Sequence, residues 1–248
     1  MIPCPNCAAP TLTKPLRLNG AVVPVDVEAC SACRLFWFDR GASVTLTAQS
    51  VIDLFRLIGA VADAQRGPPL ATSFCCPRCE KPLAPIHDVQ RTTRFTYWRC
   101  EWDRGQLMSF QQFLRAKNFI RTPTMAEIAK LRETVQQVSC SQCGAPIDLG
   151  KDSACAHCGA PIALVDPDGV AKALQALANA PKPGAADPRD VQAALAAAPV
   201  LAVAKFEAER ERERLLGRDG EPGYGTGYDL VAIGISAVAD WLATQLTV

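Results

Sequence analysis

Cysteine spacing constrains this chain more than any other feature. The 12 cysteines among its 248 residues fall into three clusters, at 4–33, 75–100 and 140–158, and most of them stand in Cys-x-x-Cys pairs. Both sulfurs of such a pair can bind one ion, and two pairs supply the four thiolates of a tetrahedral zinc site. Modules this short bury too little apolar surface to fold alone, so a metal would supply the missing stability. Because the pairs recur and the first residues show no secretory leader, we expect zinc sites in a reducing cytoplasm rather than disulfides.

The first zinc ribbon is predicted over residues 1–46. Its ligands are the first two cysteine pairs, Cys4, Cys7, Cys30 and Cys33. The stretch between the pairs contains Asn19-Gly20, which is the preferred two-residue hairpin turn because both positions accept positive φ. A hairpin here returns the second pair to the first and closes the site.

The sequence that follows these ligands carries a family resemblance. From Cys30 to Gly41 the chain reads Cys-Ser-Ala-Cys-Arg-Leu-Phe-Trp-Phe-Asp-Arg-Gly, which resembles the end of the transcription-factor-IIB-type zinc finger of small bacterial proteins. That family opens with Cys-Pro-x-Cys and closes with Cys-x-x-Cys, a spacer and Trp-x-Asp-x-Gly, usually followed by Glu, where this chain has Ala42. The resemblance implies a zinc-ribbon fold. It also leans towards DNA, RNA or transcription-complex partners, although one fold carries many functions.

A second, degenerate copy is predicted over 71–122. It repeats the Cys-Pro-x-Cys opening and supplies three ligands, Cys76, Cys79 and Cys100. Asp103 stands where the first copy has its fourth cysteine, and it is therefore the first candidate for the fourth ligand, ahead of His87 and Cys75. The continuation through Arg121 resembles a subgroup of the same bacterial family that carries His close to the position of Arg104. This site is expected to bind metal more weakly than the first, or not at all.

The third module, over 140–165, repeats one motif almost word for word. Its ligands are Cys140, Cys143, Cys155 and Cys158, and a glycine follows the second cysteine of each pair. Glycine suits a knuckle in which the chain turns tightly and directs backbone N–H groups at the sulfurs. The module resembles the short ribbons called double-zinc-ribbon domains.

Helices are predicted between and after the ribbons. Apolar residues recur at helical spacing in a connecting helix within 47–70, and Ser109 and Thr124 have the spacing of N-caps, the second opening a helix within 123–139. Apolar faces are expected from Phe110 to Ile120 in the helix that Ser109 caps and from Ile128 to Val138 in the helix that Thr124 caps. Segment 166–228 combines Ala-, Pro- and charge-rich helices with a linker, and 229–248 is an apolar C-terminal helix. The fold class is therefore a small metal-stabilised α+β protein, with tandem zinc ribbons joined by helices and an α-helical C-terminal region.

Closed four-ligand sites and the presence of only two histidines favour a non-catalytic adaptor. The alternatives are a zinc or redox enzyme that uses Asp103 as a base beside an incomplete second site, and a membrane-peripheral scaffold. Two zinc sites, each with a net charge of −2, bring the formal charge from +1 to −3, which argues against non-specific nucleic-acid binding by the whole chain.

Two partner surfaces are predicted. In the middle module, basic residues alternate with aromatic ones around Arg91, Arg94, Trp98 and Arg99, a pattern that suits single-stranded nucleic acid. The alternative is that every second strand residue belongs to the core and the arginines only keep the surface soluble. The C-terminal helix is so apolar that it must be buried, either against the rest of the chain or against another molecule. We expect a homodimer or a docked protein partner, with Trp241 as an anchor. Asp240 within that helix argues against a membrane span.

Overall fold

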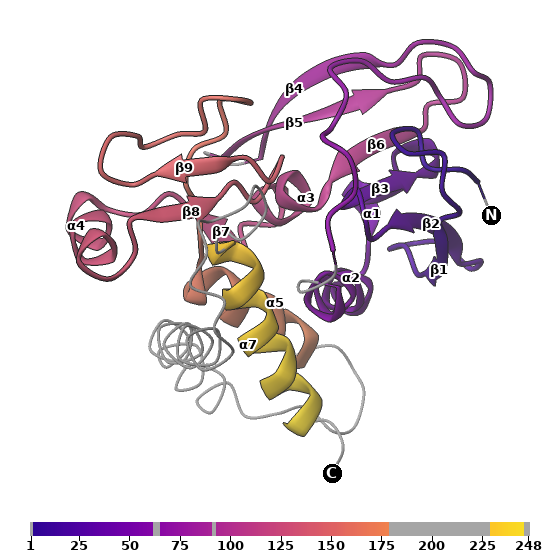
Figure 1. Ribbon diagram of the computed structural model, residues 1–248. Helices are drawn as coiled ribbons and strands as arrows, with labels where there is room; N and C mark the ends of the chain where they lie inside the picture. The colour runs from indigo at the N-terminus through magenta and orange to yellow at the C-terminus, as the bar shows by residue number, and fades with distance from the viewer. Residues whose placement is uncertain (1, 62–64, 91–92, 179–228, 246–248) are drawn as a thin grey trace. The chain divides into compact units, whose positions relative to one another are not determined.

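The computed structural model describes residues 2–61, 65–90, 93–178 and 229–245, and the chain divides into two units, Met1–Phe119 and Ile120–Val248. Arg91 and the predicted linker and helices within 179–228 lie outside the described residues. Each unit is described by itself (Figure 1).

A single antiparallel sheet forms the centre of the first unit. The strands run in the order β1-β2-β3-β6-β5-β4, so two consecutive three-stranded ribbons share one sheet (Figure 1). The strands are β1 (Leu12–Leu16), β2 (Val25–Cys30), β3 (Leu35–Phe38), β4 (Ala84–Gln90), β5 (Thr93–Arg99) and β6 (Gln106–Ser109).

The two ribbons meet along β3 and β6 with twofold pseudosymmetry. Trp37 pairs with Leu107, and each lies seven residues after an equivalent cysteine, Cys30 or Cys100. On one side of this pair Phe36 lies opposite Met108, and on the other side Phe38 lies opposite Gln106, which is the pattern that a twofold axis through the central pair produces. The tandem copies are therefore joined edge to edge, and the pairing removes two exposed strand edges.

The alternation of β3 separates two layers of core, because successive strand residues point to opposite faces. Phe36 and Phe38 pack against α3 (Phe110–Ala116), with ring centroids 4.3 Å apart for Phe36 and Phe110 and 6.1 Å apart for Phe38 and Phe113. Leu35 and Trp37 belong to a cluster on the metal-ligand side of the sheet.

Helices follow β3 as the sequence indicates. After η1 (Asp39–Gly41) and α1 (Ala42–Thr45), α2 spans Ala48–Ala60. The Thr47 hydroxyl caps α2 by accepting from the Ser50 N–H at 3.2 Å. Four residues of the predicted apolar stripe are buried in α2, namely Val51, Leu54, Phe55 and Ile58. The stripe was expected to continue through Val61, which is half-buried beyond the end of the helix, and Ala62, which lies outside the described residues. The Phe55 ring meets Phe119 edge to face at 5.0 Å.

The hairpin of the first ribbon differs from the expected two-residue turn. β1 and β2 end their pairing at Leu16 and Val25, so a longer loop joins them and Asn19-Gly20 lies inside it. The Asn19 N–H donates to the Thr45 carbonyl at 2.7 Å, and the Asn19 amide donates to Leu46 O at 3.2 Å. The loop is thus held by the segment before α2, which overrides the local turn preference.

The second unit contains the third ribbon, in which β8 and β9 form a short hairpin and β10 pairs with β7. Ile120, which was predicted on the face of α3, instead pairs with Val165 across β7 and β10, because α3 already ends at Ala116. Val135 and Val138 likewise lie beyond α4, with Val138 in β8. The elements of this unit are β7 (Ile120–Arg121), α4 (Met125–Thr134), β8 (Gln137–Ser139), β9 (Pro146–Asp148), β10 (Leu164–Val165), α5 (Pro167–Ala178) and α7 (Leu230–Gln245).

The C-terminal helix α7 packs within its own unit. The Asp229 carboxylate caps it, accepting from the N–H groups of Val231 and Ala232 at 3.1 Å, and also accepts from the Ser141 hydroxyl at 2.7 Å. Val231 and Ile235 are buried, so one apolar stripe of the helix is covered in cis. The predicted homodimer or partner contact remains a prediction. Among the described residues, no helix has both the length and the apolar character of a membrane span.

Candidate metal centres

One backbone conformation recurs in all six ligand loops. The residue after the second ligand of each pair has positive φ, between 55° and 82°: Ala8, Arg34, Glu80, Arg104, Gly144 and Gly159. The left-handed conformation costs residues other than glycine roughly 1–2 kcal/mol. Four non-glycine residues accept it here because the loop must turn back over its own ligands, as in the 2.9 Å bond from the Ala8 N–H to Cys4 O. The equivalent bond joins the Glu80 N–H to Cys76 O, also at 2.9 Å.

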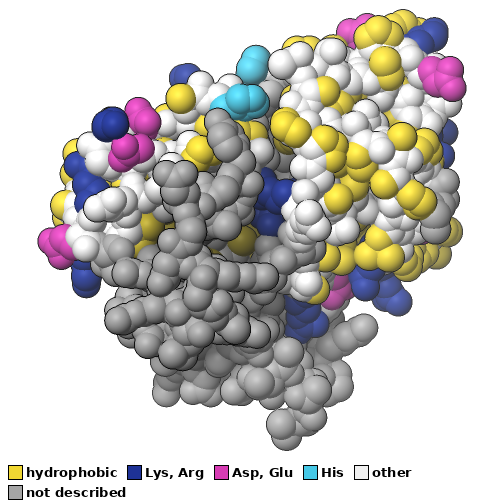
Figure 2. Space-filling view, in the orientation of Figure 1, with side chains coloured by type: hydrophobic (Ala, Val, Ile, Leu, Met, Phe, Trp, Pro, Cys, Tyr) yellow, Lys and Arg dark blue, Asp and Glu magenta, His cyan; other side chains and the backbone are white. Residues whose placement is uncertain are grey.

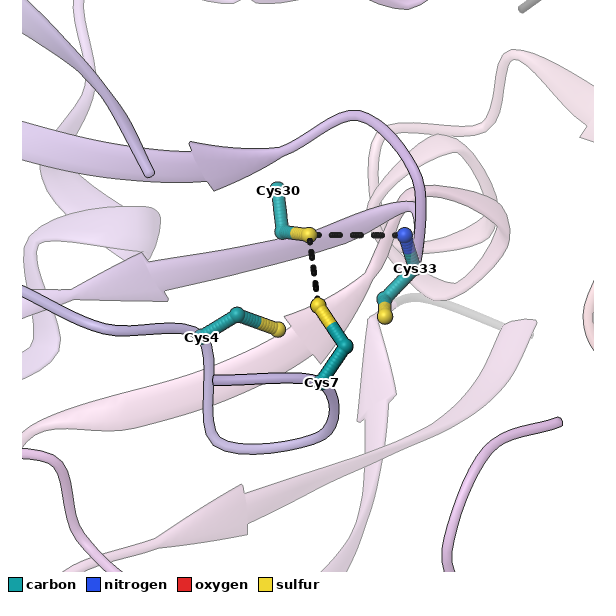
Figure 3. Close-up of side chains that lie close together, drawn as sticks. All are labelled: Cys4, Cys7, Cys30 and Cys33. Carbon is teal, nitrogen blue, oxygen red and sulfur yellow. Dashed lines mark hydrogen bonds between the residues drawn. The ribbon is translucent and has the colours of Figure 1, made fainter. Parts of the chain in front are cut away.

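The first group brings together all four of its predicted ligands (Figure 3). Every pair of sulfurs lies within 4.8 Å, and the Cys7 and Cys30 Sγ atoms are 3.8 Å apart. A tetrahedral zinc ion with Zn–S bonds near 2.3 Å requires sulfurs about 3.8 Å apart. The group therefore fits a zinc ion, whereas the sulfur separation is far too long for a disulfide.

Polar groups around the first site favour thiolates. The N–H groups of Asn6 and Cys33 point at the sulfurs of Cys4 and Cys30, each at 3.4 Å. A hydrogen bond from Cys4 lowers the pKa of Cys30 to about 5, while burial raises the pKa of Cys33 to about 12. One thiol of the group is thus ready to ionise, and a bound cation would stabilise the others as thiolates.

The second group consists of Cys76, Cys79, Cys100 and Asp103. Asp103 Oδ2 lies 3.0 Å from Cys76 Sγ, and the Cys79 and Cys100 sulfurs are 3.5 Å apart. The second carboxylate oxygen, Oδ1, accepts from the Gly105 N–H at 2.8 Å. Burial opposes ionisation, but the bonds from Cys76 and Gly105 lower the pKa of Asp103, so that the carboxylate is charged.

The other candidates for a fourth ligand lie outside this group. Cys75 is exposed and contributes its backbone to a bridge with Pro82. His87 is exposed on β4, and its Nδ1 lies 3.2 Å from the Thr96 hydroxyl. Neither side chain is among the donors that the structure brings together, whereas Asp103 is.

The third group is a second set of four thiols. The Cys140–Cys158 and Cys143–Cys155 sulfur distances are both 3.6 Å, and all four sulfurs lie within 4.8 Å of one another. A hydrogen bond from Cys158 lowers the pKa of Cys140 to about 5, and burial raises the pKa of Cys143 to about 11. This group has the same fit to a tetrahedral cation as the first.

Sequence reasoning missed the residues that connect the first two groups. The indole N–H of Trp37 donates to Asp39 Oδ1 at 2.9 Å, and Arg78 binds both oxygens of the same carboxylate, at 2.8 and 2.6 Å. Arg78 lies in the first knuckle of the second ribbon, so the Asp of the Trp-x-Asp-x-Gly motif receives a contact from the other copy. The motif marked Trp37 and Asp39, but nothing in the sequence identified Arg78 as their partner.

The basic and aromatic residues that alternate along the middle module do not form one continuous surface in the structure. Arg94 and Arg99 are five residues apart on β5 and therefore point to opposite faces of the sheet. Tyr97 is buried, Trp98 packs edge to face on Phe74 at 4.7 Å, and Lys117 donates to Ser43 O at 2.7 Å. On the face that Figure 2 shows, Lys and Arg side chains lie in separate small groups.

All three groups present four donors from two knuckles, a closed arrangement that leaves no donor position vacant in a tetrahedron. In comparisons of the chain with protein-family models, with curated proteins and with solved structures, nothing matched.

Proposed function

We propose that this chain is a non-catalytic zinc-binding protein that acts as an adaptor, with zinc as the structural metal in all three groups. The observation that carries the proposal is the repetition of one closed knuckle geometry in six loops, with donors that lie within 4.8 Å of one another in each group. Soft thiolate donors in a tetrahedral set favour zinc over magnesium or calcium, which prefer oxygen ligands. Bound zinc would supply folding free energy to ribbons whose own cores are small.

The residues that would hold the metal are the three groups described above, each acting through one donor atom per residue. Catalytic zinc sites keep one position for water or substrate. Asp103 fills the corresponding position in the second group, and its carboxylate is fixed by the Gly105 N–H. We therefore favour a structural role at this site over metal-assisted hydrolysis.

For this adaptor we favour a protein partner over nucleic acid. Of the basic residues in the middle module, Arg78 is paired with Asp39 and Lys117 is bonded to a backbone carbonyl. Arg121, near the end of the predicted module, forms an ion pair with Glu127. Trp102 is 55% exposed, and the Lys81 ammonium lies 4.2 Å from its ring centroid. An exposed aromatic ring of this kind is a typical anchor for a protein contact.

Cobalt substitution tests the structural role of the metal. Reduced chain loaded with Co²⁺ should show the visible absorption of tetrahedral thiolate-rich sites, and added cyanide or imidazole should leave that spectrum unchanged because no ligand position is open. A spectrum that shifts saturably with the added ligand, and that stops shifting in an Asp103→Cys variant, would overturn the structural role of the second site. Absence of any cobalt or zinc binding would overturn the proposal as a whole.

Nucleic-acid binding is the alternative outcome for the partner. If it occurs, affinity for a single-stranded oligonucleotide should fall steeply with salt, and Arg94→Ala and Arg99→Ala should each weaken it. Binding of that kind would replace the protein-adaptor proposal. Absence of binding at low salt supports it.

A further inference from the structure

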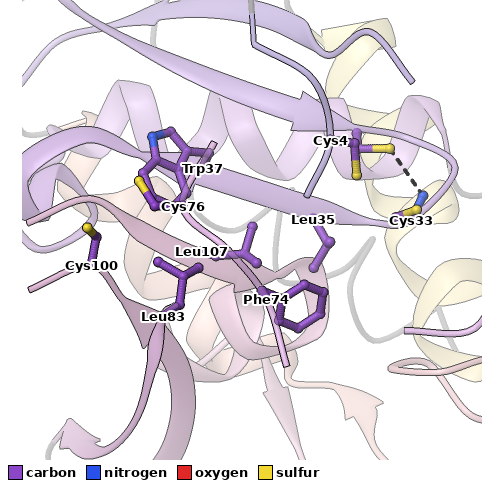
Figure 4. Close-up of a cluster of buried hydrophobic side chains, with 10 residues drawn as sticks. Cys4, Cys33, Leu35, Trp37, Phe74, Cys76, Leu83, Cys100 and Leu107 are labelled. Carbon is purple, nitrogen blue, oxygen red and sulfur yellow. Dashed lines mark hydrogen bonds between the residues drawn. The ribbon is translucent and has the colours of Figure 1, made fainter. Parts of the chain in front are cut away.

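The first and second metal groups share one hydrophobic cluster. It contains ligands of both groups together with apolar side chains of both ribbons (Figure 4). Its buried members are Cys4, Cys30, Cys33, Leu35, Trp37, Phe74, Cys76, Leu83, Cys100 and Leu107. Leu107 is 0% and Trp37 2% exposed, and they lie opposite each other across β3 and β6. Neither ribbon can therefore open without exposing apolar surface of the other.

Close packing at the centre of this cluster leaves little freedom for independent movement. Gly105 follows the second knuckle of the second ribbon, and a Cβ atom at this position would lie 2.1 Å from Cζ2 of Trp37. The indole of the first ribbon thus rests directly on the backbone that holds Asp103. The same indole is tied through Asp39 to Arg78 beside Cys76.

A second link runs from the first knuckle to the start of the second ribbon. The Asn6 amide donates to Cys33 Sγ at 3.2 Å and to Pro69 O at 3.3 Å, and its carbonyl oxygen accepts from the Ala71 N–H at 2.9 Å. This side chain joins a ligand of the first group to the segment that leads into Phe74. Loss of order in the first knuckle would therefore release the entry to the second ribbon.

The third group lies in a separate hydrophobic cluster of the described residues. Its cluster consists of residues of the second unit alone, centred on Val138, Ile147 and Leu149 with the four cysteine ligands.

We propose that metal binding at the first and second groups is positively coupled, so that the two load and release metal as one unit, while the third group binds independently. This inference rests on the proposed metal-binding function. The physical basis is that each bound ion orders a half of the same core, so the second ion to bind meets a partly ordered site. By linkage, each group must then raise the affinity of the other by the same factor.

The test uses the reduced, zinc-loaded full chain and resolves the sites by thiol protection. Aliquots are equilibrated with increasing concentrations of a zinc chelator and pulsed with N-ethylmaleimide, and peptide masses report modification of Cys33, Cys79 and Cys158. In the unmodified chain Cys33 and Cys79 should lose protection together. The midpoint of a cysteine is the chelator concentration at which half of it is modified. In Cys76→Ser, the midpoint of Cys33 should fall at least tenfold, while the midpoint of Cys158 should stay unchanged. The matched Cys143→Ser variant should leave Cys33 unchanged.

A second variant keeps all ligands in place. Leu107→Ala should lower the midpoints of Cys33 and Cys79 together, severalfold, without moving that of Cys158. The matched core variant Val138→Ala in the third ribbon should move only Cys158. If zinc binds but neither Cys76→Ser nor Leu107→Ala alters protection of Cys33, the coupling is wrong and the metal-binding proposal stands. If all the thiols of the unmodified chain react without chelator, the metal-binding proposal itself is wrong.

Discussion

The first and second ribbons have the same backbone plan and different contents. Both open with a bridge before the first cysteine, Pro3–Pro10 in one and Cys75–Pro82 in the other, and both place a left-handed residue after each second ligand. The first ends its ligand set with Cys33, whereas the second ends with Asp103.

Knuckle geometry therefore does not depend on a thiol at every position. Arg104, which follows an aspartate, has a φ of 62°. This is close to the φ of 55° at Arg34, which follows a cysteine. Asp103 preserves the turn because its side chain accepts from the Gly105 N–H, an acceptor role that short carboxylates perform in tight turns. The shared sheet and core supply the rest of the constraint.

Removal of the fourth ligand gives the largest expected effect and contrasts the two ribbons at matched positions. Cys33→Ser should abolish zinc binding at the first group and unfold its ribbon, because structural zinc supplies roughly 10–16 kcal/mol of apparent binding energy in small domains. Asp103→Ala should weaken zinc binding at the second group by at least roughly 10–100-fold, which is the cost of losing a residue that only hydrogen-bonds to a metal ligand. Chelator competition and thermal denaturation measure both.

The control for these variants is Cys75→Ser, which removes an exposed thiol next to a ligand and should change stability by no more than about 0.5 kcal/mol. If Asp103→Ala leaves a third zinc bound as tightly as the other two, Asp103 is not a ligand.

Core substitutions at equivalent positions test the asymmetry of the shared cluster. Leu35 and Gly105 each follow the left-handed residue of a knuckle. Leu35→Ala leaves a cavity beside Trp37 and should cost about 2–5 kcal/mol. Gly105→Ala drives a methyl group into the indole and should cost about 1–3 kcal/mol. Urea midpoints of the zinc-loaded chain give both values, and a neutral Gly105→Ala would show that the indole contact is loose.

A polar cluster distinguishes the first ribbon from the second. Glu28 is 4% exposed and accepts from the hydroxyls of Thr11 at 2.6 Å and Thr13 at 2.9 Å, whereas Trp98 and Leu83 stand at the matching positions of the second copy. Thr13→Val should cost about 1.5–3 kcal/mol, because the buried carboxylate loses the charge-assisted bond from this hydroxyl. In a Glu28→Leu background the same substitution should be nearly neutral. Equal costs in both backgrounds would contradict the interpretation.

The smallest expected effect is a gain in stability at the left-handed positions. Ala8→Gly and Glu80→Gly should each stabilise by about 0.5 kcal/mol, since relief of the left-handed strain exceeds the extra chain entropy of glycine. The reverse change, Gly159→Ala at φ 70°, should destabilise the third ribbon by about 1 kcal/mol. Loss of stability in both glycine variants would mean that the ordinary side chains make compensating contacts.

Local patterns predicted the parts of the structure that depend on neighbours in the chain. Cysteine spacing predicted the eleven cysteines of the three donor groups, and the caps at Ser109 and Thr124 follow from their own side chains. The Thr124–Glu127 capping box is complete. At the other cap, Gln112 accepts instead from the Thr96 N–H at 3.0 Å, a tertiary contact that the spacing could not reveal.

Pairings between distant segments could not be predicted. The ladder of β3 with β6 joins residues about seventy positions apart, and short apolar strands carry no signal that selects one another among several edges. Ile120 was placed on a helix for the same reason, since its partner Val165 is remote in the sequence. For the fourth donor of the second group the sequence favoured Asp103 over two other residues, and the knuckle geometry places its Oδ2 3.0 Å from Cys76 Sγ.

The most direct test of the account is the mass of the folded, reduced chain after exhaustive alkylation, measured under native conditions. Three donor groups that contain every cysteine except Cys75 predict three bound zinc ions and a single alkyl group, located on Cys75. Two zinc ions with alkylation of Cys76, Cys79 and Cys100 would contradict the second site. A chain that carries no zinc and reacts at all 12 cysteines would contradict the account as a whole.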